Sequence, residues 1–169
     1  MDYNLKKISQ GAIGEATSKA EHYRYLNEPE ESESICRDIL EVEPENQNAL
    51  RLLGLSIMDQ FIGVASDRYP EAEDTFKNLT DRYERLYYTG LLYEKRGRAQ
   101  LRTGHPPRAL LPLFEKALKC FEEAEKIKPA GNDNAVLRWN TCVRLLQSQT
   151  ERWEQQSTSF GATDTPPFN

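Results

Sequence analysis

Residues 46–57 read Asn-Gln-Asn-Ala-Leu-Arg-Leu-Leu-Gly-Leu-Ser-Ile and follow closely after Pro44. Related residue types stand 34 residues earlier, with Ala20 at the place of the small Gly54 and Tyr23 at the place of Ile57. A repeat of this length indicates stacked pairs of helices, because one pair cannot bury its apolar face alone. We therefore expect a fold made of tandem two-helix units.

These residues resemble the tetratricopeptide repeat (TPR) family. That family places particular residue types at positions 4, 7, 8, 11, 20, 24, 27 and 32 of its repeat. With Gln47 as position 1, the matching residues of repeat 2 are Leu50, Leu53, Gly54 and Ile57. The resemblance implies an all-α fold, a right-handed α-solenoid of antiparallel helix pairs. We assign this domain to residues 11–155, with an N-terminal extension at 1–10 and a flexible tail at 156–169.

The first two repeats depart from the family pattern. In repeat 1 we expect a first helix from about Ala12 to Leu26, a left-handed turn residue at Asn27, and a second helix beginning at Pro29. Repeat 2 has six extra residues around Gln60 to Tyr69, which either lengthen its first helix or form a loop.

The third repeat is elongated. Its first helix is predicted from about Tyr83 to Thr103, where Gly104 provides a stop signal. The partner helix is expected from Pro107 to Lys128, and Pro112 either kinks this helix or marks its true start.

Two glycines stand out within the elongated helix of repeat 3. Gly90 and Gly97 lie on one stripe of the elongated helix, which suggests that another backbone approaches closely there. The expected neighbour is the alanine-lined face of Ala109, Ala117 and Ala124.

A last amphipathic helix from about Asp133 to Glu154 is expected to cap the stack.

Composition and charge limit the class of protein. The chain has 169 residues, a net charge of −5 and 38% hydrophobic residues, with no apolar run long enough to span a membrane. Cys36, Cys120 and Cys142 stand in apolar helical patterns and are expected to be buried, reduced thiols, as in a cytoplasmic protein. Acidic residues dominate 15–46, whereas basic residues dominate 82–108.

The sequence indicates no catalytic centre. His22 and His105 have no metal-ligand spacing to a cysteine or carboxylate, and Gly11 and Gly14 form no phosphate-binding loop. A Cys–His nucleophile pair stays open at this point. We expect a protein that is not an enzyme and that has no cofactor and no metal.

The TPR resemblance also implies where a partner would bind. In that family the concave groove is lined by the first helix of each pair, at positions 2, 5, 6, 9, 12 and 13. Here those positions include the carboxylates Asp59 and Glu94. Our candidate peptide-binding residues at these positions are Arg51, Leu55, Met58, Tyr87, Tyr88, Leu91 and Lys95, and the elongated helix continues the stripe through Arg98 and Arg102. Mixed tyrosine, leucine and guanidinium groups suit a peptide or loop with acidic and apolar side chains.

The leading hypothesis is a non-catalytic adaptor that holds a partner protein in this groove. The positions where chaperone-binding members carry a carboxylate clamp do not match that clamp; they are Thr17, Glu21, Leu52, Glu84 and Tyr88. The alternative is a structural subunit that self-associates, for example as a homodimer, through its acidic and basic regions. RNA binding by the face that carries Tyr88, Arg98 and Arg102 is the least supported hypothesis, because the net charge is negative.

Overall fold

The computed structural model describes residues 3–61 and 68–160, with side chains as far as residue 149. In these residues the fold is all-α, with seven α-helices, one short 3-10 helix and no strand. In chain order the elements are η1 (Gln10–Ala12), α1 (Ile13–Tyr25), α2 (Pro29–Val42), α3 (Gln47–Asp59), α4 (Tyr69–Lys77), α5 (Arg82–Arg102), α6 (Pro107–Lys126) and α7 (Asn134–Phe160).

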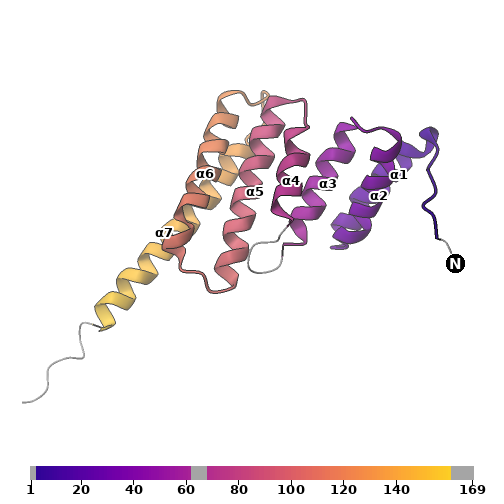
Figure 1. Cartoon of the computed structure of the whole chain (residues 1–169). Coiled ribbons are helices and arrows are strands. Elements are labelled where there is room, and N and C mark those ends of the chain that lie inside the picture. Colours follow the sequence, from indigo (N-terminus) through magenta and orange to yellow (C-terminus); the bar gives the residue numbers. More distant parts are fainter. Residues whose placement is uncertain (1–2, 62–67, 161–169) are drawn as a thin grey trace, which may run out of the picture.

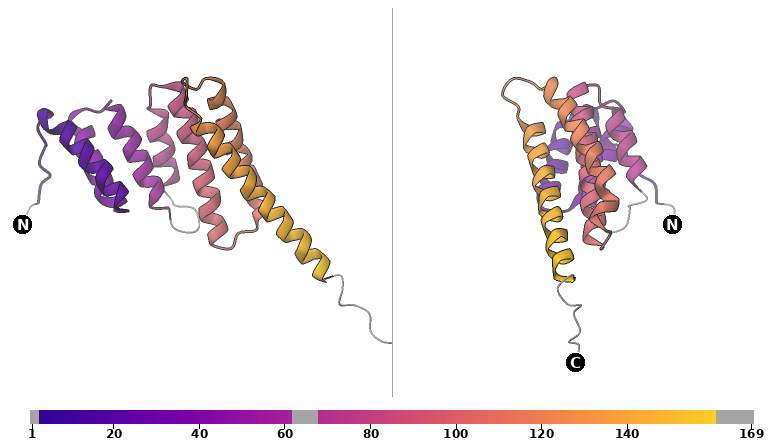
Figure 2. Two further views of the ribbon diagram at one scale, coloured as in Figure 1. Left: turned by 180° about the vertical axis from the view of Figure 1, so that it is seen from behind. Right: turned by 90° about the vertical axis from the view of Figure 1, so that its left-hand side faces the viewer.

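The helices stand in a row that follows the order of the chain (Figure 1). Each helix packs against the next one, and α1 also touches α3 while α5 touches α7. Seen from behind, α7 lies across α5 and α6 and extends beyond them (Figure 2). The first and last helices therefore occupy opposite ends of the molecule.

Local sequence signals explain most helix boundaries. The Asn46 side chain accepts a hydrogen bond from the backbone N–H of Ala49, and the Asp81 side chain accepts one from Glu84. Both are N-caps that satisfy amides at the first turn of a helix. Asn27 has a φ of +60°, so the predicted left-handed turn residue is confirmed.

The predicted helices are found with small shifts at their ends. The elongated helix of repeat 3 is α5, and its partner α6 begins at Pro107. Pro112 lies inside α6, so the alternative in which it starts the helix is wrong. The last helix continues to Phe160, past the point where we placed the tail, and residues 161–169 lie outside the described part.

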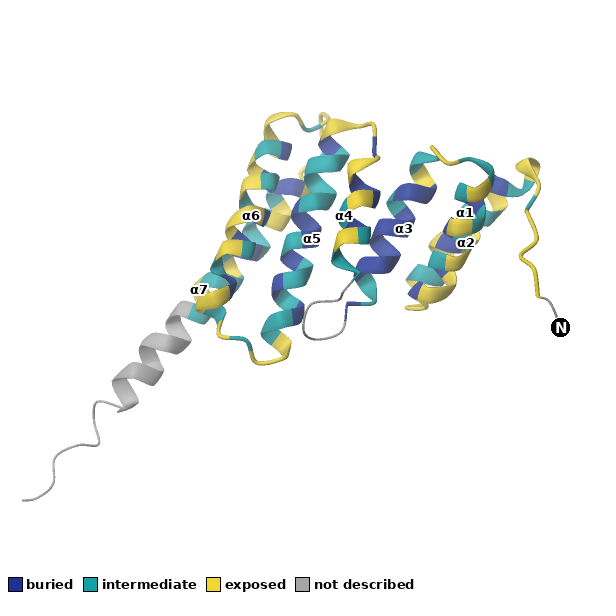
Figure 3. Cartoon of the chain, viewed as in Figure 1, coloured by how far each residue is buried: buried dark blue, intermediate teal, exposed yellow. Residues whose placement is uncertain are grey.

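The extra residues of repeat 2 fall between two helices. Helix α3 ends at Asp59 and α4 begins at Tyr69, so the insertion does not lengthen the first helix of this repeat. Residues 62–67 themselves lie outside the described part. Most residues of α3 are buried, because it packs against α1, α2 and α4 (Figure 3).

Phenyl rings fill the space left by the helix glycines. A Cβ atom added at Gly54 would stand 2.4 Å from the Phe76 ring, and one at Gly90 would stand 2.6 Å from the Phe121 ring. At Gly97 the corresponding distance to the Phe114 ring is 2.8 Å.

The atoms nearest to Gly90 and Gly97 thus belong to the rings of Phe121 and Phe114, so the prediction that another backbone approaches there, along an alanine-lined face, is wrong. Ala117 and Ala124 are buried in the core, whereas Ala109 is exposed. A phenyl ring fits over each of these glycines because glycine has no Cβ atom, which leaves room for the ring of the facing helix.

Candidate functional site

A hollow of about 290 Å³ lies where the first helices of the predicted repeats meet the last helix. Side chains from α1, α3, α5 and α7 line it; they are Arg24, Leu55, Met58, Asp59, Leu91, Glu94, Lys95, Arg98, Arg102 and Arg138. The apolar side chains come from α3 and α5, and the basic ones come mainly from α5.

Helix α5 supplies a continuous stripe of this lining. Leu91, Lys95, Arg98 and Arg102 follow one another at steps of three or four residues, so they share one face of the helix. The stripe begins with an apolar residue and becomes basic toward the C-terminus of α5. Cations at that end also interact favourably with the helix dipole.

Asp59 connects three helices on one side of the hollow. The Nε of Arg24 in α1 donates a hydrogen bond of 2.8 Å to its Oδ2 atom. The Nζ of Lys95 in α5 donates one of 2.9 Å to its Oδ1 atom. Both carboxylate oxygens of Asp59 are therefore engaged inside the protein.

Glu94 is the second carboxylate of the lining, and it pairs with one arginine of its own helix and one of α7. It is only 2% exposed, and its Oε1 accepts a hydrogen bond of 2.8 Å from Arg98 Nε. Arg138 of α7 places Nη1 3.6 Å from the same oxygen. No donor in the described residues reaches Oε2. Because a buried carboxylate is costly without partners, Arg98 and Arg138 are held close to it.

The hollow keeps an excess of positive charge. Five basic side chains line it, against two carboxylates. Arg24 and Arg98 use Nε for the internal carboxylates, and no acceptor within 3–61 and 68–149 takes their Nη hydrogens. Arg102 is exposed and forms no ion pair with any described residue. Such a site attracts an anion.

Six of the nine candidate residues line this hollow: Leu55, Met58, Leu91, Lys95, Arg98 and Arg102. The other three lie elsewhere. Arg51 forms an ion pair with Glu84, with 3.1 Å between Nη2 and Oε1.

Tyr87 and Tyr88 belong to an aromatic cluster, together with Phe76, Tyr83 and Phe121. Tyr88 stacks on Phe76, with 5.4 Å between the ring centroids. Burial raises the pKa of the Tyr88 hydroxyl to about 12. These rings pack within the protein, as aromatic side chains commonly do.

Four lining residues were not among the candidates, although the repeat contains a signal for each. Asp59 and Glu94 occupy groove positions of the family pattern. Arg24 stands 34 residues before Met58, and Arg138 falls on a groove position if Asp133 is counted as position 1. What the spacing did not reveal is that the two carboxylates pair with these arginines.

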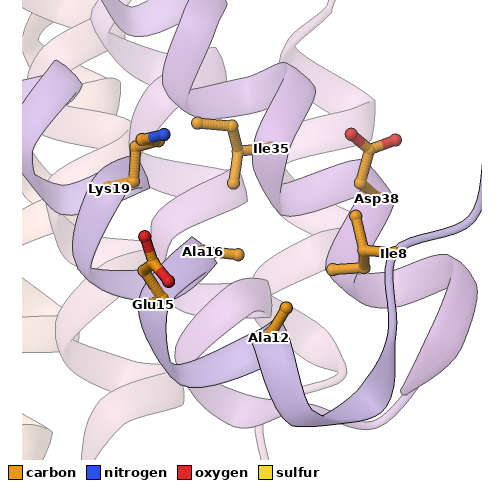
Figure 4. A pocket seen from close by; sticks show the side chains of 7 residues that line it. All are labelled: Ile8, Ala12, Glu15, Ala16, Lys19, Ile35 and Asp38. Atoms are coloured by element: carbon orange, nitrogen blue, oxygen red, sulfur yellow. The ribbon is translucent and has the colours of Figure 1, made fainter.

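A second hollow, of about 310 Å³, lies near the N-terminus, and Figure 4 shows the side chains that line it. It is bordered by α1, α2 and the segment before η1, and its lining is Ile8, Ala12, Glu15, Ala16, Lys19, Ile35 and Asp38. None of the candidate residues lines it. Its small apolar side chains and mixed charges give no indication of a particular ligand.

Nucleophilic chemistry has little support in the described residues. Burial raises the pKa of the Cys36 and Cys142 thiols to about 12 and that of Cys120 to about 11, so all three are protonated at neutral pH.

No group of histidine, cysteine and carboxylate side chains in the described part is arranged to hold a metal ion. Within the same part, no helix is both long and apolar enough to cross a membrane.

Comparison of the chain with protein-family models, with curated proteins and with solved structures gave no match.

Proposed function

We propose that this protein is a non-catalytic adaptor with a TPR-like α-solenoid fold, which holds a peptide or loop of a partner protein in the basic hollow. One observation carries this proposal. Four residues chosen from the groove positions of the repeat line a single hollow together with Arg98 and Arg102 of the elongated helix, and its arginines keep unused hydrogen-bond donors.

The glycine and phenylalanine contacts support the solenoid arrangement. Gly90 faces Phe121 and Gly97 faces Phe114, so seven residues forward on α5 correspond to seven residues back on α6. This register is expected of two antiparallel helices. Gly54 and Phe76 occupy the same two repeat positions as Gly90 and Phe121, which supports a second pair built in the same way.

The chemistry of the lining favours a peptide with two kinds of side chain. Leu55, Met58 and Leu91 offer apolar surface, and the basic side chains lie beside them. A partner segment with one apolar side chain and one acidic group would match the apolar and the basic parts of this lining.

The same lining argues for binding over catalysis. It contains no serine, threonine, cysteine, histidine or tyrosine, and both of its carboxylates are already paired with basic groups. Neither carboxylate is therefore placed to transfer a proton to a guest. The three free cysteines, of which two are buried, suit the reducing cytoplasm.

The test is affinity capture from the native host with wild-type protein and an Arg102→Glu variant. Arg102 is exposed and has no internal ion pair in the described part, so its reversal removes charge from the hollow without uncovering a buried group. Arg98 is a poorer choice, because its replacement would leave the buried Glu94 without its hydrogen-bond donor. We expect Arg102→Glu to reduce capture of the specific partner at least about tenfold, as expected for a close charge pair.

Lys126→Glu is the matched control. Lys126 is also the exposed last residue of its helix, α6, but it does not line the hollow. Both reversals have the same unfavourable interaction with a helix C-terminus. Equal capture by Arg102→Glu and Lys126→Glu would show that the hollow is not the binding site.

A further inference from the structure

Internal carboxylates orient two of the arginines in the hollow. Asp59 holds the Nε of Arg24, and Glu94 holds the Nε of Arg98, both at 2.8 Å. A guanidinium group fixed through Nε keeps the hydrogens of its two Nη atoms available on the opposite edge. Because its fork is planar and rigid, little freedom is lost when it binds an anion with several oxygens.

The charge of the hollow exceeds what one carboxylate can neutralise. Arg102 and Arg138 add two further guanidinium groups beside the oriented pair, and Lys95 adds an ammonium group. A partner carboxylate brings one negative charge and two acceptor oxygens. A phosphoryl group carries nearly two charges and three strong acceptor oxygens at neutral pH, so it matches this set better.

We infer that the hollow recognises a phosphorylated side chain on the partner segment, an inference that rests on the proposed peptide groove. The phosphoryl oxygens accept hydrogen bonds from Arg98, Arg102 and Arg138. A neighbouring apolar side chain of the partner packs on Leu55, Met58 and Leu91, the apolar part of the same lining.

A protein ligand fits these observations better than RNA does. Single-stranded RNA binding relies on exposed aromatic rings that stack with bases. Tyr87 and Tyr88 stand next to the groove residues in sequence, but their rings pack on each other and on Phe121 and Phe76. The hollow itself is lined by aliphatic and charged side chains.

The experiment compares three labelled libraries of short peptides in fluorescence polarisation. Their central residue is phosphoserine, glutamate or serine, and all flanking positions are degenerate. We expect the phosphoserine library to bind at least about tenfold more tightly than the glutamate library, because it forms more charge-assisted hydrogen bonds. Arg102→Gln should remove most of this preference, whereas Lys126→Gln should leave it unchanged.

Equal binding of the phosphoserine and glutamate libraries, or binding of neither, would overturn the phosphoryl inference. Tighter, Arg102-dependent binding of a single-stranded RNA oligonucleotide would also overturn it. A phosphatase-treated host lysate gives an independent readout, because capture of the partner should then fall. If capture depends on Arg102 but survives the phosphatase, only this inference fails and the peptide groove stands. If capture does not depend on Arg102, the groove itself fails.

Discussion

Two junctions of this molecule join pairs of helices by different interactions. Between α5 and α6 the contact is apolar, with the rings of Phe121 and Phe114 seated on Gly90 and Gly97. Between α2 and α4 the contact is charged. We call it the Glu33 network; its members are Glu33, Arg37, Gln60, Arg68 and Glu71.

The Glu33 network is closely bonded. Arg68 donates to both oxygens of Glu33, with Nη2 at 2.6 Å and Nη1 at 2.9 Å. Arg37 donates to the same carboxylate at 2.7 Å and also pairs with Glu71. Such bidentate pairs add geometric specificity as well as energy.

The difference between the junctions follows the difference in the sequence. At the apolar junction Gly90 and Phe121 stand at positions of the expected repeat pattern, whereas Gly97 and Phe114 lie in the elongated part of repeat 3, and the fit of the rings over the glycines sets the register. The Glu33 network stands where repeat 2 carries its insertion, and Arg68 is the first described residue after residues 62–67. Ion pairs thus join the helices beside the insertion of repeat 2.

The largest expected effect is at the apolar junction. Phe121→Ala removes a fully buried ring that fills the space over Gly90, so we expect a loss of about 3–5 kcal/mol in the free energy of unfolding. Urea denaturation followed by circular dichroism measures this loss. The exposed Leu137 of α7 provides the control, since Leu137→Ala should change stability by less than about 0.5 kcal/mol. Similar losses for the two variants would contradict the packing described here.

A methyl group added under a ring should have the next largest effect. Gly54→Ala places a Cβ only 2.4 Å from the fully buried Phe76 ring, and overpacking of this kind costs about 1–3 kcal/mol. Gly14→Ala in α1 meets no atom within 4 Å and should instead stabilise the helix by up to about 1 kcal/mol. Thermal unfolding of the two variants should therefore shift in opposite directions. A gain in both would mean that the ring has room to move.

A substitution at the charged junction should have the smallest effect on the free energy of unfolding. It is the only one of the three effects that depends on pH. Hydrogen bonding by Arg68, supported by Arg37 and Gln60, lowers the pKa of Glu33 from 4.5 to about 2. Because the unfolded chain then binds the proton more tightly, this stabilisation is complete above about pH 4.5 and is lost as the pH falls toward 2.

Glu33→Gln should therefore cost about 1–2 kcal/mol at pH 7, and its difference from wild type should vanish near pH 2. Urea unfolding of both proteins across this pH range measures that difference. If the free energies of unfolding of the two proteins changed in parallel with pH, the pKa of Glu33 would be the same in the folded and the unfolded chain.

Local signals were sufficient to predict the helices. Asn27, Pro29, Gly104 and Pro107 mark turns and helix starts through their own backbone preferences, and those preferences do not depend on distant residues. Repeat spacing and the period of the elongated helix together selected six residues that line one hollow, because the helical period sets the side to which a side chain points.

Side-chain partners could not be predicted in the same way. Tyr87 and Tyr88 occupy groove positions, yet their rings pack on neighbours that come from other helices. Arg51 likewise pairs with Glu84 across two helices. A residue's position in a repeat gives its direction, but its contacts depend on which side chains of other helices reach the same point.

The sequence by itself determined the all-α class, most helix starts and the stripe of α5 that faces the hollow, since helical periodicity and caps act over a few residues. Only the tertiary structure decided which charges stay available to a partner. Asp59 and Glu94 take the Nε groups of Arg24 and Arg98 from other turns and other helices, and this leaves the Nη groups and Arg102 facing the hollow. The pairing of Arg24 with Asp59 joins residues 35 positions apart in the chain, and only the fold sets the distance between them.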